Sequence, residues 1–208
     1  MKIGILGSGN IGGSLGRLWA AAGHEVFFAS RHPEELQELA EEAGHGARVG
    51  TSDEAMAFGD VVLDALPFAA SLDLPADALA GKILVMASNY YPERDGDIDL
   101  GGVSQSECLA AKLTDTHVVK AFNMMSASEM EARANGMDHD EIAILFAGND
   151  DDAKSAARQL IEDAKFVPVD AGKLRQGELF QSGDVLYAKR LTHDEAVASL
   201  TDLENATG

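Results

Sequence analysis

Three glycines near the start of the chain, Gly7, Gly9 and Gly12, have the type and spacing that could bind a phosphorylated ligand. An apolar run at 2–6 leads into them, and a helical pattern of apolar residues follows at once. In this setting Gly7 allows a tight turn, Gly9 lets the backbone approach a diphosphate, and Gly12 lets the helix pack on the strand. The unpaired N–H groups and the positive dipole end of the helix attract phosphate. The turn therefore predicts a dinucleotide-binding site, and the alternative is a glycine-rich turn in an unrelated αβ unit.

Ser30, Arg31 and His32 follow the next β-prone run, 25–29, where a site that prefers NAD would offer Asp or Glu to the ribose 2′-hydroxyl. A hydroxyl, a guanidinium and an imidazole can instead bind a 2′-phosphate and offset its charge. We therefore expect NADP (NADPH) as the cofactor, in contact with these three residues. The alternative is that Arg31 and His32 are solvated loop residues leading into a helix that starts at Pro33.

Strand-like and helix-like patterns alternate along the rest of the chain, as a parallel sheet with crossover helices requires. Further strands are expected at 47–49, 60–66, 82–87, 116–122, 142–147 and 166–169. Helices are expected at 33–43, 51–58, 72–79, 104–113, 150–164 and from 126 and 192 onward, whereas 170–184 reads as a loop. The predicted fold class is α/β, a doubly wound and mostly parallel sheet (Rossmann fold, NAD(P)-binding) with a small C-terminal αβ extension.

Ligands of a doubly wound sheet bind at the carboxyl ends of its strands, so the residues that follow each apolar run are site candidates. They are Leu66, Pro67, Phe68, Ala87, Ser88, Asn89, Tyr90, Tyr91, Asn123, Met124 and Met125. The first six are expected to contact the cofactor, and Asn123, Met124 and Met125 to contact a second substrate. For Pro67 and Phe68 a strand stop and a core aromatic are the alternative, and for the two methionines it is core filling.

The composition limits the class of protein. Its 208 residues include 16 Lys and Arg against 35 Asp and Glu, a formal net charge of −19, which disfavours nucleic acid and anionic membrane surfaces as partners. The length fits one compact domain, 1–208, with a dinucleotide-binding core at 1–125 and an extension at 126–208 that completes the acceptor site. With one cysteine, no metal-ligand spacing among the histidines, and neither a signal sequence nor a membrane-spanning stretch, we expect no metal and a cytoplasmic location.

The glycine turn, Ser30 with Arg31, and the segments 118–123, 147–150 and 169–172 together resemble the NADPH-dependent coenzyme F420 reductase family. The resemblance spans most of the chain. Many dehydrogenases share the glycine turn, while Lys-Ala-Phe-Asn at 120–123 and Asp-Ala-Gly at 170–172 are narrower signals. Proline biosynthetic reductases resemble the N-terminal half but carry a helical C-terminal domain, and membrane ferric reductases carry a similar domain.

The resemblance implies that a hydride passes directly from the nicotinamide to a deazaflavin stacked beside it. We therefore expect hydride transfer between NADP(H) and a planar redox acceptor, a deazaflavin (coenzyme F420) or a flavin. The resemblance also implies that the diphosphate is held by Gly7, Ser8, Gly9, Asn10 and Ile11, and the 2′-phosphate by Ser30 and Arg31.

Such a transfer needs alignment of two rings more than it needs an acid or a base, so no catalytic residue is assigned. Lys120, Tyr90 and His117 are the polar residues nearest the strand ends, and a structural role is the more common one for each. A homodimer is expected, because most soluble oligomers are twofold. The alternative function is that of an NADP-binding sensor or scaffold protein without turnover.

Overall fold

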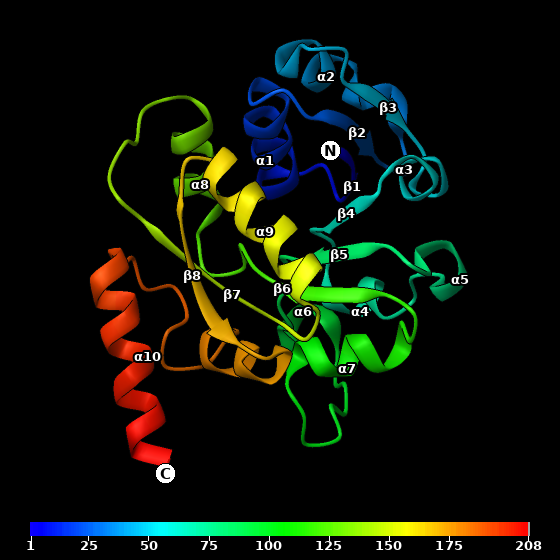
Figure 1. The fold of residues 1–208 in the computed structure, drawn as a ribbon. Helices are drawn as coiled ribbons and strands as arrows, with labels where there is room; N and C mark the ends of the chain where they lie inside the picture. Colours follow the sequence, from blue (N-terminus) through cyan, green and yellow to red (C-terminus); the bar gives the residue numbers. More distant parts are fainter. Residues whose placement is uncertain (208) are drawn as a thin grey trace.

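The computed structural model describes residues 1–207, which form one eight-stranded sheet between two layers of helices (Figure 1). The strand order is β3-β2-β1-β4-β5-β6-β7-β8, and all neighbouring strands are parallel except β6 and β7. The strands are β1 (Lys2–Leu6), β2 (Glu25–Ala29), β3 (Arg48–Gly50), β4 (Val61–Asp64), β5 (Ile83–Met86), β6 (His117–Lys120), β7 (Ala143–Gly148) and β8 (Val167–Gly172). The order reverses beside β1, so the predicted doubly wound α/β fold is confirmed.

Helices cover both faces of the sheet and bury its apolar residues on each side. One face carries α1 (Asn10–Ala21), α2 (Gln37–Ala43), α8 (Ala127–Ala134) and α9 (Asp151–Asp163). The opposite face carries α3 (Ser52–Phe58), α4 (Phe68–Ser71), α5 (Ala76–Leu79), α7 (Gln105–Lys112) and the 3₁₀ helix η2 (Leu174–Phe180). The C-terminal helix α10 (His193–Thr207) packs on β7 and β8, and the short segments η1 (Pro33–Leu36) and α6 (Pro92–Asp95) lie in connections.

Three helices begin with capping hydrogen bonds at positions that the sequence predicts. Thr51, Ser104 and Ser126 each accept a bond from the backbone N–H three residues later, and a glutamate at that position bonds back to the cap. These reciprocal bonds satisfy donors that the first helical turn leaves unpaired. The capping boxes thus fix where α3, α7 and α8 begin, and with them the turns that precede these helices.

Two expectations about local structure are corrected. The single helix expected at 72–79 is instead the pair α4 and α5, because Pro75 caps α5 and cannot continue a helix from the preceding turn. The segment 170–184, expected to be a loop, contains the end of β8 and then η2. A 3₁₀ helix lacks the 3.6-residue apolar repeat on which the sequence reading depends.

Among residues 1–207 no helix combines the length and the apolar character that crossing a bilayer requires. Within the same residues, no three His, Cys, Asp or Glu side chains are grouped so as to hold a metal ion.

Candidate functional site

The glycine turn between β1 and α1 has the geometry that its sequence predicts. Gly7 has φ +88°, a conformation that side chains disfavour, and a Cβ at Gly12 would lie 2.2 Å from the Gly7 carbonyl oxygen. At Gly9, in contrast, no atom of residues 1–207 lies within 4 Å of where a Cβ would stand. Gly9 precedes the first residue of α1, and no side-chain hydrogen bond caps the first N–H groups of this helix. The backbone is thereby shaped to meet an anion.

A cavity of about 560 Å³, here called the loop cavity, lies beside this turn. It is bounded by the glycine turn, the end of β2, the start of α3 and the turn after β4. Its lining residues are Gly7, Ser8, Gly9, Ala29, Ser30, Arg31, Leu36, Ser52, Leu66, Pro67 and Ala70. Ser8 Oγ donates a 3.0 Å hydrogen bond to the Ala29 carbonyl, which ties the turn to the end of β2.

Arg31 supplies the positive charge of the loop cavity. Its side chain is exposed and makes neither a hydrogen bond nor an ion pair with any residue of the described chain. Ser30 Oγ beside it accepts a 3.1 Å bond from the backbone N–H of His32. The His32 ring lines no part of this cavity, and its Nδ1 lies 3.6 Å from a Glu34 carboxylate oxygen. An unpaired guanidinium and a hydroxyl therefore meet at the end of β2, where they could bind a phosphate ester.

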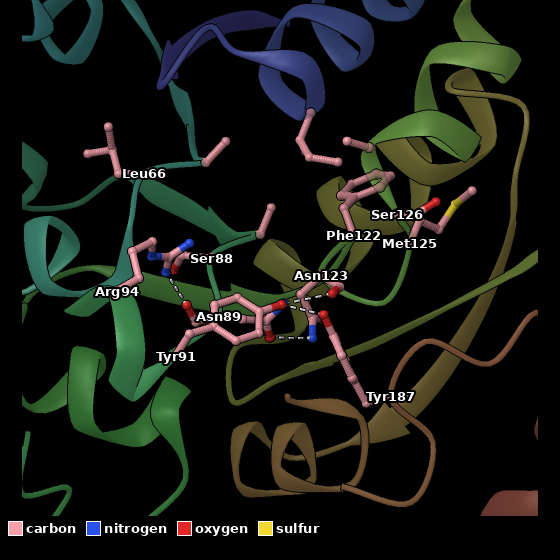
Figure 2. Close-up of a pocket in the computed structure, with 14 residues that line it drawn as sticks. Leu66, Ser88, Asn89, Tyr91, Arg94, Phe122, Asn123, Met125, Ser126 and Tyr187 are labelled. Atoms are coloured by element: carbon pink, nitrogen blue, oxygen red, sulfur yellow. Dashed lines mark hydrogen bonds between the residues drawn. The ribbon is translucent and has the colours of Figure 1, made fainter. Parts of the chain in front are cut away.

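A second cavity of about 260 Å³, here called the strand-end cavity, lies at the carboxyl ends of β4, β5 and β6 (Figure 2). It is lined by Ile11, Ala65, Leu66, Ala87, Ser88, Asn89, Tyr91, Arg94, Phe122, Asn123, Met125, Ser126, Ala127 and Tyr187. Leu66 lines both cavities, and Ile11 belongs to the first turn of α1. The two cavities therefore adjoin, and a ligand held at the glycine turn could extend into the second one.

Asn89 and Asn123 form the polar wall of the strand-end cavity (Figure 2). Asn123 Nδ2 donates to Asn89 Oδ1 at 3.1 Å and to the Phe180 carbonyl at 2.7 Å, and Asn89 Nδ2 donates to the Asn123 carbonyl at 2.8 Å. Asn123 is 3% exposed, and its Oδ1 has no hydrogen-bond partner within residues 1–207. Leaving a buried acceptor unpaired costs about 1–3 kcal/mol, so the packing around Asn123 holds this oxygen in place at a cost in stability.

The preceding residue, Phe122, has φ +62°, which is unfavourable for an aromatic side chain. Its ring is buried and packs edge-on against Trp19 at 5.7 Å between centroids. Such backbone strain costs about 1–3 kcal/mol and persists where packing enforces it. Here the strained turn after β6 carries Asn123 into the cavity wall.

Two tyrosines and an arginine close the other side of the strand-end cavity. The hydroxyl groups of Tyr91 and Tyr187 are hydrogen-bonded to one another. The Arg94 guanidinium lies 5.0 Å from the centre of the Tyr91 ring and donates a 2.6 Å hydrogen bond to the Asn89 carbonyl. Desolvation and the bond to Tyr91 raise the pKa of Tyr187 above its ordinary value.

Comparison with known proteins decides the family. A family model described as NADP oxidoreductase, coenzyme F420-dependent, matches residues 2–90. A solved structure from Arthrobacter sp. FB24, proposed to be an F420-dependent NADP reductase, is 30% identical with a TM-score of 0.66, over 84% of this chain and 86% of that one. The chain belongs to the F420-dependent NADP oxidoreductase family. The family and the NADP cofactor predicted from the sequence are thereby confirmed.

Two further relatives of the oxidoreductase are informative. The hypothetical protein SMa0349 of Sinorhizobium meliloti is 30% identical with a TM-score of 0.80, over 93% of this chain and 96% of that one. Metalloreductase STEAP3 of Rattus norvegicus is 33% identical over 175 residues, which are 83% of this chain and 34% of that protein. The chain thus spans about a third of the length of the curated relatives it matches.

The loop cavity fits the cofactor of this family. The open space at Gly9 admits a diphosphate against the backbone, and Arg31 offers a cation with no partner in the described chain for a 2′-phosphate. The strand-end cavity adjoins the loop cavity at Leu66 and leaves room for the nicotinamide end of the cofactor.

Most of the residues predicted to contact the cofactor or the second substrate line one cavity or the other, with four exceptions. Asn10 lines a separate depression beside α1, and His32 points away from the loop cavity. Phe68 is fully buried with its ring 5.7 Å from that of Tyr90, and Met124 is buried against β7 and β8. The core role considered for Phe68 and Met124 is the one that their burial favours.

The three residues weighed as proton carriers lie outside both cavities. His117 stands at the amino end of β6, 3.3 Å from Asp150, so the expectation that it lies near the strand ends of the site is wrong. Tyr90 turns its hydroxyl to the Gly96 carbonyl and the Ile98 N–H.

Lys120 is fully buried beneath the strand-end cavity, where its Nζ donates to the Ser88 carbonyl. Burial lowers the pKa of Lys120 to about 7, against the attraction of the Asp64 carboxylate. Burial also raises the pKa of Asp64, which accepts hydrogen bonds from Ser71 Oγ at 2.9 Å and Ser88 Oγ at 3.0 Å. This buried pair fixes Ser88 and supports the cavity floor.

Arg94 and Tyr187 were not predicted as site residues. Arg94 lies on the short helix α6, and Tyr187 follows η2, in a segment whose sequence carries no ligand-binding motif. Only the tertiary fold brings Tyr187 to Tyr91, which lies 96 residues earlier in the chain.

Proposed function

We propose that this chain transfers a hydride between NADP(H) and a planar redox acceptor, a deazaflavin such as coenzyme F420 or a flavin. The observation that carries the proposal is the pair of adjoining cavities, one at the glycine turn with the unpaired guanidinium of Arg31 and one at the strand ends. When bound, NADPH supplies the hydride, and the protein's task is to hold two rings in contact and keep water away.

The division of labour between the cavities follows from their linings. Gly7, Gly9, Ser30 and Arg31 in the loop cavity would bind the diphosphate and the 2′-phosphate. In the strand-end cavity, Phe122, Met125, Tyr91 and Tyr187 offer the flat or polarisable groups that suit a planar ring. Tyr187 supports the further proposal that the extension at 126–208 completes the acceptor site of the core at 1–125.

The experiment is an acceptor assay with NADPH and NADH supplied separately. We expect oxidation of NADPH with a deazaflavin or a flavin, and a much slower reaction with NADH at the same concentration. Tight NADPH binding in a thermal shift series with no oxidation by either acceptor would contradict the proposal and support the sensor or scaffold. A homodimer and a cytoplasmic location stay predictions, and light scattering on the purified chain tests the first.

A further inference from the structure

Tyr91 and Tyr187 form a hydroxyl pair at the wall of the strand-end cavity. Tyr91 comes from the turn between β5 and α6, and Tyr187 from the segment between η2 and α10. Figure 2 shows the two hydroxyl groups turned toward one another. Both side chains are half-buried, and both line the cavity in which we place the acceptor.

The hydrogen bond between these hydroxyls uses one of their two protons. Either hydroxyl can be the donor. Burial and this same bond raise the pKa of Tyr187, so of the two Tyr187 is the one that resists giving up its proton to a ligand. When Tyr187 donates, the Tyr91 proton has no acceptor within residues 1–207 and lies at the edge of a cavity. A phenol O–H in that position is available to a ligand.

A second hydroxyl group and a guanidinium lie beside the Tyr91 side chain. The Tyr187 hydroxyl is hydrogen-bonded to the Tyr91 hydroxyl and can donate to a Tyr91 oxygen that has lost its proton, and the Arg94 guanidinium lies 5.0 Å from the Tyr91 ring centre. Arg94 is held there by the Asn89 carbonyl at 2.6 Å and by Asp95 at 2.8 Å. The Asp95 carboxylate is also near Tyr91, but it is occupied by Arg94 and by the Tyr91 backbone N–H at 2.9 Å. A cation and a hydrogen-bond donor thus stand where a phenolate would form.

We propose that Tyr91 is the catalytic proton donor of the reaction, and that Tyr187 and Arg94 are its positioning residues. The inference rests on the proposed function. An acceptor that gains a hydride gains two electrons and one proton, and it becomes basic at a ring nitrogen. The Tyr91 Oη–H bond breaks and its proton goes to that nitrogen, so that the acceptor has gained two electrons and two protons in all. The Tyr91 phenolate, stabilised by Tyr187 and Arg94, then regains a proton from water.

The test uses the full chain with Tyr91→Phe, Tyr187→Phe and the matched control Tyr90→Phe. Tyr90 is the neighbouring tyrosine, and its hydroxyl bonds only backbone groups outside the cavity, at Gly96 and Ile98. For each variant, fluorescence titration gives the NADPH Kd, and single-turnover mixing with a deazaflavin, in H₂O and D₂O, gives the reduction rate.

We expect Tyr91→Phe to slow acceptor reduction by about 100-fold, the lower range for loss of a general acid. Tyr187→Phe should slow it by about 10-fold, because one hydrogen bond to the phenolate is lost. NADPH binding should be retained in all variants, Tyr90→Phe should keep the full rate, and the solvent isotope effect of the natural chain should disappear in Tyr91→Phe.

Two results would overturn the inference while leaving the proposed function intact: a Tyr91→Phe variant with the full rate, or one with an unchanged solvent isotope effect. Loss of NADPH binding by Tyr91→Phe would also overturn it, since the residue would then serve the cofactor. Absence of acceptor reduction by the natural chain would overturn both proposals at once.

Discussion

The two cavities are built in different ways. The loop cavity takes its key groups from one contiguous turn, Gly7 to Gly9, and from the end of a neighbouring strand at Ser30 and Arg31. The strand-end cavity is assembled from side chains spread from Ile11 to Tyr187. The first uses backbone shape and one free cation, whereas the second uses a hydrogen-bonded network of Asn and Tyr side chains. Cofactor binding should therefore depend on local backbone, and the acceptor step on tertiary support.

The largest effect on stability should come from removing Lys120, which supports the strand-end cavity from below. Lys120→Met leaves the buried Asp64 carboxylate without its cationic partner, so we expect the free energy of unfolding to fall by about 3–5 kcal/mol. Urea denaturation measures it. At urea concentrations too low to unfold it, the variant should still bind NADPH, because Lys120 lines neither cavity. It should, however, reduce the acceptor slowly. If cofactor binding fails while the fold persists, the two cavities do not depend on separate parts of the chain.

The buried pair of Lys120 and Asp64 also predicts that the free energy of unfolding depends on pH. Burial lowers the pKa of Lys120 from 10.5 to about 7, so between these values the folded chain binds fewer protons than the unfolded chain. Stability from this group therefore rises with pH across that window, and the cost of burying the charge is present in full below it. The stability difference between the natural chain and Lys120→Met should grow in urea titrations from about pH 7 to about pH 9.5. A constant difference would show that Lys120 stays charged throughout.

Arg31→Ala tests the cation of the loop cavity. We expect NADPH binding to weaken by about 1.5–3 kcal/mol, the worth of a charge-assisted hydrogen bond, and NADH binding to change little. Titration of the same variant with both nucleotides measures the difference, and NADH is the internal control. Equal weakening of both nucleotides would mean that Arg31 does not recognise the 2′-phosphate.

Gly9→Ala should produce a smaller effect confined to the loop cavity. A Cβ at Gly9 meets no atom of residues 1–207 within 4 Å, so the fold should be unchanged, but the methyl group would stand where a diphosphate approaches. We expect the NADPH Kd to rise about 10-fold, which is about 1.4 kcal/mol. Gly13→Ala is the control, since its Cβ would touch only Leu39 and Ser8 at 3.4 Å or more. Unchanged affinity in Gly9→Ala would place the diphosphate elsewhere.

The difference between the locally built loop cavity and the strand-end cavity, which is assembled from distant residues, also explains which features the sequence could predict. The glycine turn, the end of β2 and the capping boxes are local, so their residues are adjacent in the chain and their chemistry can be recognised there. The α/β order follows from the alternation of apolar patterns. The Tyr91–Tyr187 contact joins residues far apart in the chain, and η2 lacks an apolar repeat, so neither could be predicted from spacing. His117 was misplaced because a predicted strand does not by itself show which of its end residues face the site.

The most direct test of the central claim is transfer of a label from NADPH carrying deuterium at the reactive position of its nicotinamide ring. The label should be followed into a deazaflavin, whose acceptor carbon does not exchange with water, by mass spectrometry after one turnover. The account predicts that the deuterium appears in the reduced deazaflavin. Bound NADPH that stays unoxidised, or a reduced acceptor without the label, would contradict direct hydride transfer across the two adjoining cavities.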